Sequence, residues 1–280
     1  MKYKVIFMIV AAVMLLISAG CGEQTQNNIN TNSSGKGKVI IGFDENFPPF
    51  GFKDEAGNIV GFDIDLAKET MKRLGREVEF KPIDWANKEN ELNSGNIDII
   101  WNGLEIIDDR ERYILFSKPY MSSGQIVFVH HSNQLSLITS KSKLAGAVIG
   151  VQADSTAEAH LNLDNELRYT LKDLRRYSDN ATAFEDLANR KIDAVIADEI
   201  NGRYYVFRNG IDSKIDALDI PIGEEGKIAI GFRKDDTALC EEVQQAFDSM
   251  IKDGTAKKIS KKWFGKDLIL SNKLLNIIPN

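Results

Sequence analysis

Apolar residues along this chain alternate between short continuous runs and a helical spacing. Near-continuous apolar runs at 39–43, 97–101 and 192–197 are typical of buried strands, whereas apolar positions from Phe62 to Leu74 recur on one helix face. Further strands are expected at 78–83, 125–130, 147–151 and 227–232, and further helices at 88–95, after Ser155, from about 179, and at 199–208, 237–252 and 256–263. Repeated strand–helix units predict an α/β fold with a mainly parallel sheet flanked by helices.

The first segment has the pattern of an export signal. Lys2 and Lys4 precede an apolar run from Val5 to Ile17, and small residues follow. A membrane-spanning helix needs about 20 apolar residues, so this shorter run fits a processed signal better than a permanent anchor. We therefore expect residues 1–20 to be a signal peptide.

Cys21 directly follows Ala19 and Gly20, which resembles the processing site of a bacterial lipoprotein. The alternative is an ordinary secretory signal followed by an incidental cysteine. Residues 21–37 are rich in Asn, Ser, Thr, Gly and Gln, and such a segment cannot bury enough apolar surface to order itself. We expect a lipidated tether at 21–37 that holds the protein on the extracytoplasmic face of the cell membrane.

Composition excludes several classes of function. The formal net charge of −6 and the pI near 5.3 argue against a nucleic-acid partner, which requires a clustered basic surface. If Cys21 is lipidated, Cys240 has no partner, so a disulfide framework is excluded. The histidines, His130, His131 and His160, have no accompanying Cys/His cluster, and we expect neither a metal nor a cofactor.

Six short segments occur in a fixed order: Phe47-Pro48-Pro49-Phe50, GFDIDL (61–66), NIDIIWNGLEIIDDRERYILFSKPY (96–120), GVQADSTAE (150–158), KIDAVIADE (191–199) and KKWFG (261–265). Together they resemble the extracytoplasmic solute-binding proteins of ABC transporters, in their polar amino-acid branch. The resemblance runs from about residue 38 onward. It implies a two-lobed, type II periplasmic-binding-protein-like fold. It also implies a free amino acid and permease subunits as partners, and we expect a monomer.

In that family the chain crosses twice between the lobes. Transferred to this sequence, lobe 1 comprises 38–120 and 226–280, and lobe 2 comprises 125–222. The crossings fall near 120–124 and 223–226, where glycines would tolerate the backbone changes of hinge closure.

A free amino acid presents a carboxylate, an ammonium and a side chain, and Arg110 is the candidate for the carboxylate. It lies in a polar turn after a buried strand, where open α/β folds bind ligands, and its guanidinium matches a carboxylate bidentately. The residues alone favour the alternative, a solvated arginine paired with Asp108 or Glu111. The resemblance, with Asn102 and Gly103 in register, implies the ligand role.

The turn from Gln152 to Thr156 would complete the carboxylate site. Ser155 or Thr156 can cap the following helix, and a helix N-terminus offers free N–H groups to an anion. Asp198 follows the strand at 192–197 and resembles the family's ligand for the α-ammonium; alternatively, it only caps the next helix.

Asp44, Phe47 and Trp85 resemble the family's side-chain pocket, with two aromatic walls and a polar group at the tip. Glu105 stands where relatives usually carry Ser or Thr against the ligand's amino group. It could select a ligand with extra positive charge, be neutralised by a neighbour such as Lys118, or turn outward.

These features favour binding without covalent chemistry. The expected ligand is a polar amino acid, with arginine, lysine, histidine or glutamine favoured over acidic ones and cystine still open. The rival function is an exported enzyme on the same fold, resembling dehydratases that act on prephenate-like acids, with Glu105 as general acid or base.

Overall fold

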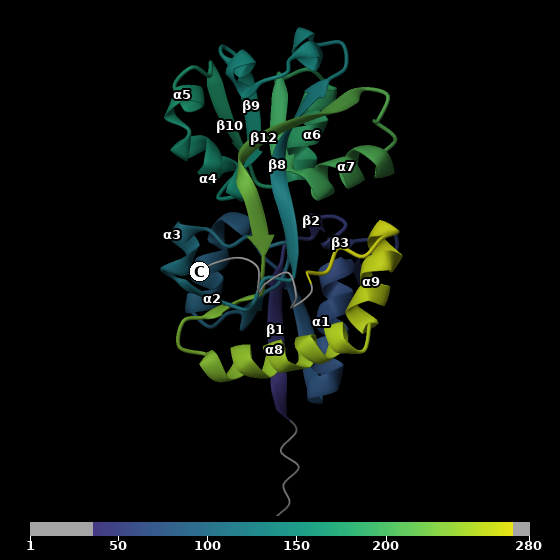
Figure 1. Ribbon diagram of the computed structural model, residues 1–280. Coiled ribbons are helices and arrows are strands. Elements are labelled where there is room, and N and C mark those ends of the chain that lie inside the picture. The colour runs from purple at the N-terminus through teal and green to yellow at the C-terminus, as the bar shows by residue number, and fades with distance from the viewer. Residues whose placement is uncertain (1–35, 271–280) are drawn as a thin grey trace, which may run out of the picture. The chain divides into compact units, whose positions relative to one another are not determined.

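The structure is a computed structural model that describes residues 36–270 (Figure 1). The predicted signal peptide and Cys21 lie outside the described residues. Lys36 and Gly37, expected at the end of the tether, already belong to the first strand, because Lys36 pairs with Arg76 of a neighbouring strand.

Lobe 1 is built on a five-stranded sheet. Its strands, in spatial order, are β5 (Arg76–Pro82), β1 (Lys36–Phe43), β6 (Ile99–Ile100), β13 (Gly231–Arg233) and β7 (Ile114–Phe116). β13 is antiparallel to both of its neighbours, so the other four strands share one direction.

Helices cover both faces of this sheet. On one face, Ile41 of β1 packs in a core with α1 (Phe62–Leu74), α8 (Thr237–Lys252) and α9 (Thr255–Phe264). On the other face, Ile100 of β6 packs with Leu92 of α2 (Lys88–Asn93) and with Trp85 of the short 3-10 turn η1 (Trp85–Asn87). Lobe 1 also contains the short helix α3 (Asp108–Glu111) and a small sheet of β2 (Asn46–Phe47), β3 (Gly51–Lys53) and β4 (Ile59–Val60).

Lobe 2 repeats this plan. Its sheet has the order β10 (Asp173–Tyr177), β9 (Val148–Gln152), β11 (Ala194–Asp198), β8 (Met121–His130) and β12 (Ile215–Ile228), with β8 antiparallel to both neighbours. Its helices are α4 (Thr156–Leu163), α5 (Asn165–Arg168), α6 (Asn180–Ala188) and α7 (Glu199–Arg208), with 3-10 turns η2 (Gln134–Leu137) and η3 (Lys141–Leu144). Two cores, one containing Ile149 and Leu161 and the other Phe184 and Val195, lie on opposite faces of the sheet. The predicted α/β fold is confirmed.

One predicted strand is divided between two strands in the structure. The run 227–232 was expected as a single strand, but β12 ends at Ile228 and β13 begins at Gly231. The chain changes partners there: Ile228 pairs with Met121 of β8, whereas Gly231 pairs with Ile100 and Phe116 in the other sheet. The apolar run therefore serves two sheets, which periodicity does not reveal. The small sheet β2-β3-β4 was also not predicted.

β8 and β12 run side by side between the two lobes (Figure 1). Their pairing extends from Met121 opposite Ile228 to His130 opposite Ile215. The register shifts between Ile222 and Gly226, so the ladder is irregular where a crossing was expected. The lobe boundaries themselves stay a prediction.

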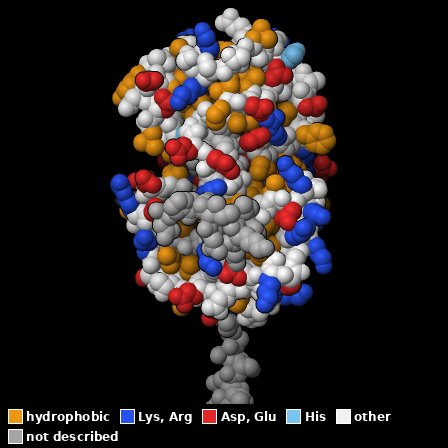
Figure 2. Space-filling view, in the orientation of Figure 1, with side chains coloured by type: hydrophobic (Ala, Val, Ile, Leu, Met, Phe, Trp, Pro, Cys, Tyr) orange, Lys and Arg blue, Asp and Glu red, His pale blue; other side chains and the backbone are white. Residues whose placement is uncertain are grey.

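Acidic and basic side chains are interspersed on the coloured part of the face seen in Figure 2. Within residues 36–270, no helix is both long and apolar enough to span a bilayer.

Candidate functional site

A small cavity lies where the carboxyl ends of strands from both lobes meet. Its volume is about 30 Å³, enough for water but not for an amino acid. The residues around it come from both sheets and include seven of the ten predicted site residues: Phe47, Trp85, Gly103, Glu105, Gln152, Thr156 and Asp198. The other three, Asp44, Asn102 and Arg110, contact members of this set or each other.

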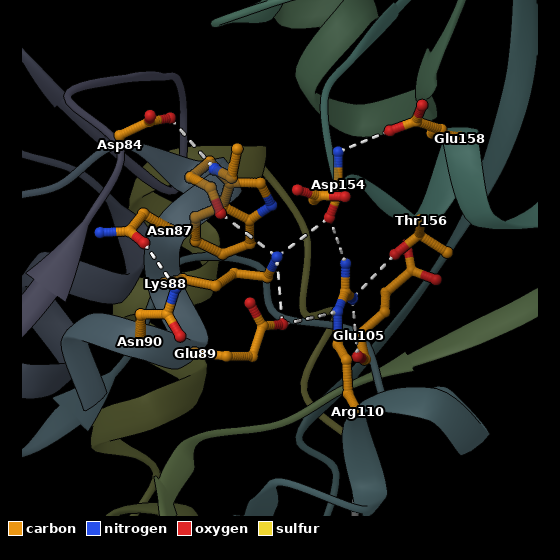
Figure 3. A network of polar contacts seen from close by, with 12 residues as sticks. Asp84, Asn87, Lys88, Glu89, Asn90, Glu105, Arg110, Asp154, Thr156 and Glu158 are labelled. Atoms are coloured by element: carbon orange, nitrogen blue, oxygen red, sulfur yellow. Dashed lines mark hydrogen bonds and ion pairs between the residues drawn. The ribbon is translucent and has the colours of Figure 1, made fainter. Parts of the chain in front are cut away.

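Arg110 of α3 reaches across the cleft into lobe 2. Nη1 donates to Oγ1 of Thr156 at 3.1 Å and to the carbonyl of Glu105 at 3.0 Å, and Nη2 donates to the carbonyl of Asp154 at 3.0 Å (Figure 3). The side chain is only 4% exposed, and burial lowers its pKa, but a guanidinium stays charged. Its acidic neighbour is Glu89, at 3.8 Å, rather than Asp108 or Glu111. A fixed, desolvated cation thus stands beside the N-terminus of α4.

Lys88, the first residue of α2, was not predicted as part of the site. It is 1% exposed, and its Nζ donates to the carbonyls of Trp85 at 3.2 Å and Asp154 at 3.0 Å (Figure 3). Nζ also lies 3.2 Å from a carboxylate oxygen of Glu89 and 5.2 Å from the centre of the Trp85 ring. Burial, then the charge of Arg110, lowers the Lys88 pKa to about 8. A lysine at the start of a polar helix looks exposed in sequence, so no local pattern marks it.

Ser155 and Asp154 shape the turn that receives these two cations. Ser155 caps α4 by accepting from the N–H of Glu158, as predicted for this turn. Asp154 has a φ of 53°, a left-handed conformation that is uncommon for a residue with a side chain. In this turn, the carbonyl of Asp154 accepts from both Lys88 and Arg110.

Glu105 points inward. Its side chain is 3% exposed, and Oε1 accepts a 2.6 Å hydrogen bond from Nε2 of Gln125 on β8. Oε2 is buried with no hydrogen-bond partner in the described part of the chain. Burial, then the charge of Asp198, raises the Glu105 pKa to about 8. Lys118, considered as a neutralising partner, instead pairs with Asp248 at 3.2 Å. The outward and Lys118-paired alternatives are therefore wrong.

Asp198 caps a helix, and its role toward the α-ammonium stays a prediction. Oδ1 accepts from the N–H of Asn201 at 2.8 Å and so caps α7, while the residue also lines the cavity. It is 7% exposed, and burial raises its pKa to about 6. Hydrogen bonds from Ser123 and from the backbone of Asn201 and Ile200 lower this pKa and so oppose the effect of burial.

The predicted pocket for the side chain of the ligand lies beside Glu105 and Asp198. The rings of Phe47 and Trp85 are nearly parallel, 6° apart in plane, with centres 6.5 Å apart. A planar group between two rings needs roughly 7 Å, so a small opening would admit one. Asp44 accepts from Nε2 of Gln152 at 2.6 Å, and burial raises its pKa to about 6. Asn102 holds this carboxylate residue in place by accepting from the N–H of Asp44 at 3.0 Å.

Two further polar residues were missed. Asn201 of α7 donates through Nδ2 to the carbonyl of Pro48 in the other lobe at 2.7 Å. Its Oδ1 accepts from Nδ2 of Asn180, which lines the cavity. Asn180 lies at the start of a predicted helix, and Asn201 closely follows the predicted strand at 192–197. These positions are the one sequence signal that could have drawn attention to the two residues. Residues 36–270 contain no group of His, Cys, Asp and Glu side chains placed to hold a metal ion.

Comparison with known proteins shows the family of the chain. The family model for bacterial extracellular solute-binding proteins, family 3, matches residues 39–266. The chain belongs to this family.

Members of the family resemble the chain over almost its full length. The L-cystine-binding protein TcyJ of Escherichia coli K12 is 29% identical over 261 residues, covering 92% of this chain and 94% of that protein. The arginine-binding extracellular protein ArtP of Bacillus subtilis 168 is 30% identical over 262 residues, covering 93% and 98%. A histidine-bound ABC uptake transporter substrate-binding protein of Streptococcus pneumoniae superposes with a TM-score of 0.79 at 36% identity, covering 84% of this chain and 95% of that one. The similarity to this solved structure confirms the two-lobed fold.

Proposed function

We propose that this protein is the substrate-binding component of an ABC transporter and captures a free polar amino acid between its lobes. The observation that carries the proposal is the separation of charge across the cleft. Arg110 donates to Thr156 at the N-terminus of α4, and Thr156, Glu105 and Asp198 line one small cavity. This is the arrangement that an α-carboxylate and an α-ammonium require.

The ligand's carboxylate would compete for the donors that Arg110 now directs at Thr156 and Asp154. Its side chain would pass between Phe47 and Trp85 toward Asp44. Because Asp44 stands at the end of this path, and Glu105 and Asp198 line the adjoining cavity, a cationic or neutral polar side chain fits, and an acidic one would meet like charges at a cost of several kcal/mol. Cystine, arginine and histidine, named for the similar proteins, all satisfy this condition.

Closure around the ligand would exclude water and strengthen each pairing. To move the open and closed populations from 99:1 to 1:99, the ligand must favour the closed form by about 5.5 kcal/mol. The closed form would then be recognised by the permease subunits that receive the amino acid. The similar proteins are named as binding proteins, which supports binding over the rival enzymatic function.

We further propose that the protein acts as a monomer outside the cytoplasmic membrane, exported by the segment 1–20 and held by a lipid on Cys21. The sequence pattern of these residues supports this part of the proposal.

A thermal-shift screen of the twenty amino acids, ornithine and cystine, followed by calorimetry, tests the binding function. A ligand at a thousand times its Kd stabilises the folded protein by about 4 kcal/mol. We expect arginine, lysine, histidine, glutamine or cystine to shift the unfolding midpoint, and glutamate and aspartate to leave it unchanged. If none of the compounds binds, the proposal is wrong; tight binding of glutamate would overturn the assigned pocket.

A further inference from the structure

The cavity carries two carboxyl groups at the end where one amino group is expected. Glu105 comes from the loop after β6 and Asp198 from the end of β11, and both are more than nine-tenths buried. Two negative charges facing one small desolvated space repel each other strongly, so such a pair retains a proton that belongs to the pair rather than to either residue.

The hydrogen-bonding of Glu105 leaves room for that proton and for a ligand. Gln125 donates to Oε1, whereas Oε2 is buried with no partner within residues 36–270. Arg110 does not neutralise the carboxylate directly, because its Nη1 donates to the main-chain carbonyl of Glu105. An unpartnered buried oxygen beside a cavity is costly unless it is protonated or meets a donor that arrives with the ligand.

The hinge strand β12 fixes the position of this oxygen. A Cβ added at Gly226 would lie 1.9 Å from Oε2 of Glu105, so only glycine lets the carboxyl group occupy this place. Glu105 is thus held between Gln125 on one crossing strand and Gly226 on the other.

The charged groups on the neighbouring elements either pair with other residues or are exposed to solvent. On β12, Lys227 donates to Ser122, and Glu224 and Glu225 are exposed. On α4, Glu158 pairs with Arg176, and His160 lies 3.0 Å from the carbonyl of Ile222. Beyond burial, the negative charge of Asp198 on β11 raises the pKa of Glu105, and the positive charge of Arg110 on α3 lowers it.

We infer that Glu105 and Asp198 share a proton in the empty site and that the amino group of the ligand displaces it, so that capture of the amino acid releases a proton. This inference rests on the proposed function and assigns Glu105 to the amino group rather than to the side chain of the ligand. The ligand's ammonium places a positive charge between the two carboxylates and stabilises both in their ionised form. The raised pKa values of about 8 for Glu105 and about 6 for Asp198 agree with a proton held near neutral pH.

Release of a proton makes the affinity for the ligand depend on pH. Below the pKa of the empty pair, binding must expel a proton, so affinity rises with pH. Each pH unit in that window changes the Kd up to tenfold for one proton released. Above the pKa of the empty pair, the proton is already gone and the affinity becomes constant.

Calorimetry of L-arginine binding near pH 7, repeated in buffers of different ionisation enthalpy, measures the proton count directly. For the wild-type protein we expect close to one proton released per arginine. In Glu105→Gln, which keeps the shape and removes the titrating group, the release should fall to near zero and the pH profile of the Kd should flatten between about pH 6 and 8. Glu224→Gln, an exposed carboxylate two residues from Gly226, is the matched control and should behave as the wild type.

The outcomes separate this inference from the proposed function. If arginine and the other amino acids fail to bind the wild-type protein, the proposed function fails. Binding with no proton release overturns the inference and leaves the function intact, as does a release that persists unchanged in Glu105→Gln. The buffer series on the wild-type protein decides the question even if the variant does not fold.

Discussion

Gln152, at the end of β9, donates a 2.6 Å hydrogen bond to Asp44, just after β1, and so joins the carboxyl ends of strands from the two sheets. Asp44 was expected to meet the tip of the ligand's side chain, and in the cavity an amide occupies that place. A cationic ligand side chain would have to share or replace this amide. The contact therefore links closure of the lobes to the part of the site that selects the ligand.

Arg110→Ala should abolish amino-acid binding while the protein stays folded. Losing one partner of a desolvated, charge-assisted pair costs about 2–5 kcal/mol, which corresponds to roughly 30-fold to 4,000-fold in Kd. Calorimetry measures the affinity and circular dichroism the fold. Arg112→Ala is the control, because that side chain is exposed and pairs with the exposed Asp109. Unchanged affinity in Arg110→Ala would remove this residue from the site.

Gly226→Ala should weaken ligand binding by disfavouring the closed form. The added methyl group would overlap Oε2 of Glu105, and overpacking of this kind costs about 1–3 kcal/mol. Gly124→Ala, in the facing hinge strand, is the matched control because a Cβ there meets nothing within 4 Å. Combining Gly226→Ala with Glu105→Ser should remove the added cost in a double-mutant cycle. An equal loss for the two alanine variants would point to hinge flexibility instead.

Trp85 should report closure by fluorescence. It lines the cavity and packs near Lys88, so its surroundings change when ligand enters. Trp101 is fully buried in the core of lobe 1, and Trp263 donates to Asp65 in the same lobe, so both serve as silent references. We expect the emission change on adding ligand to vanish in Trp85→Phe. A signal that survives would place the reporter at Trp101 or Trp263.

Cys21→Ala should release the protein from the membrane without changing its ligand affinity, since the cysteine is not among the residues of the candidate site. Fractionation of cells expressing either form measures the distribution, and calorimetry on the released protein measures the Kd. If the variant stays entirely with the membrane, the apolar segment rather than a lipid provides the anchor.

The ligand-free protein should be more stable in mildly acidic than in alkaline solution. Asp63 accepts from Tyr120 and from the N–H of Gly103, and burial raises its pKa from 3.8 to about 7 in the folded state. A carboxyl whose pKa is raised on folding contributes stability that is present below about pH 4 and lost as the pH rises through about 7. Each such group adds a slope of up to about 1.4 kcal/mol per pH unit.

Asp44, Glu105 and Asp198 act in the same direction, because their pKa values are also raised. We expect the free energy of unfolding to fall between about pH 5 and 8, measured by chemical denaturation. Asp63→Asn should reduce this slope, whereas Asp248→Asn, an acidic partner of the surface residue Lys118, should not. A slope that rises with pH would contradict the buried, protonated state assigned to these carboxyls.

Hydrophobic periodicity predicted the alternating elements and the fold class, and the resemblance to a known family pointed to most of the residues that meet at the candidate site. Runs such as 192–197 end at buried strand termini, and polar residues after those termini, including Asp198, must lie at one edge of the sheet. Local spacing encodes this because strand and helix periods are fixed by backbone geometry.

Only the tertiary structure decided which polar groups face each other. Lys88 lies in a helix of polar residues and is nevertheless buried, because Asp154 and Trp85, from different parts of the chain, enclose its amine. Glu105 turns inward because Gln125 and the bare backbone of Gly226 leave space for it there. Burial and charge pairing at these positions depend on contacts between residues far apart in sequence, and no local pattern carries that information.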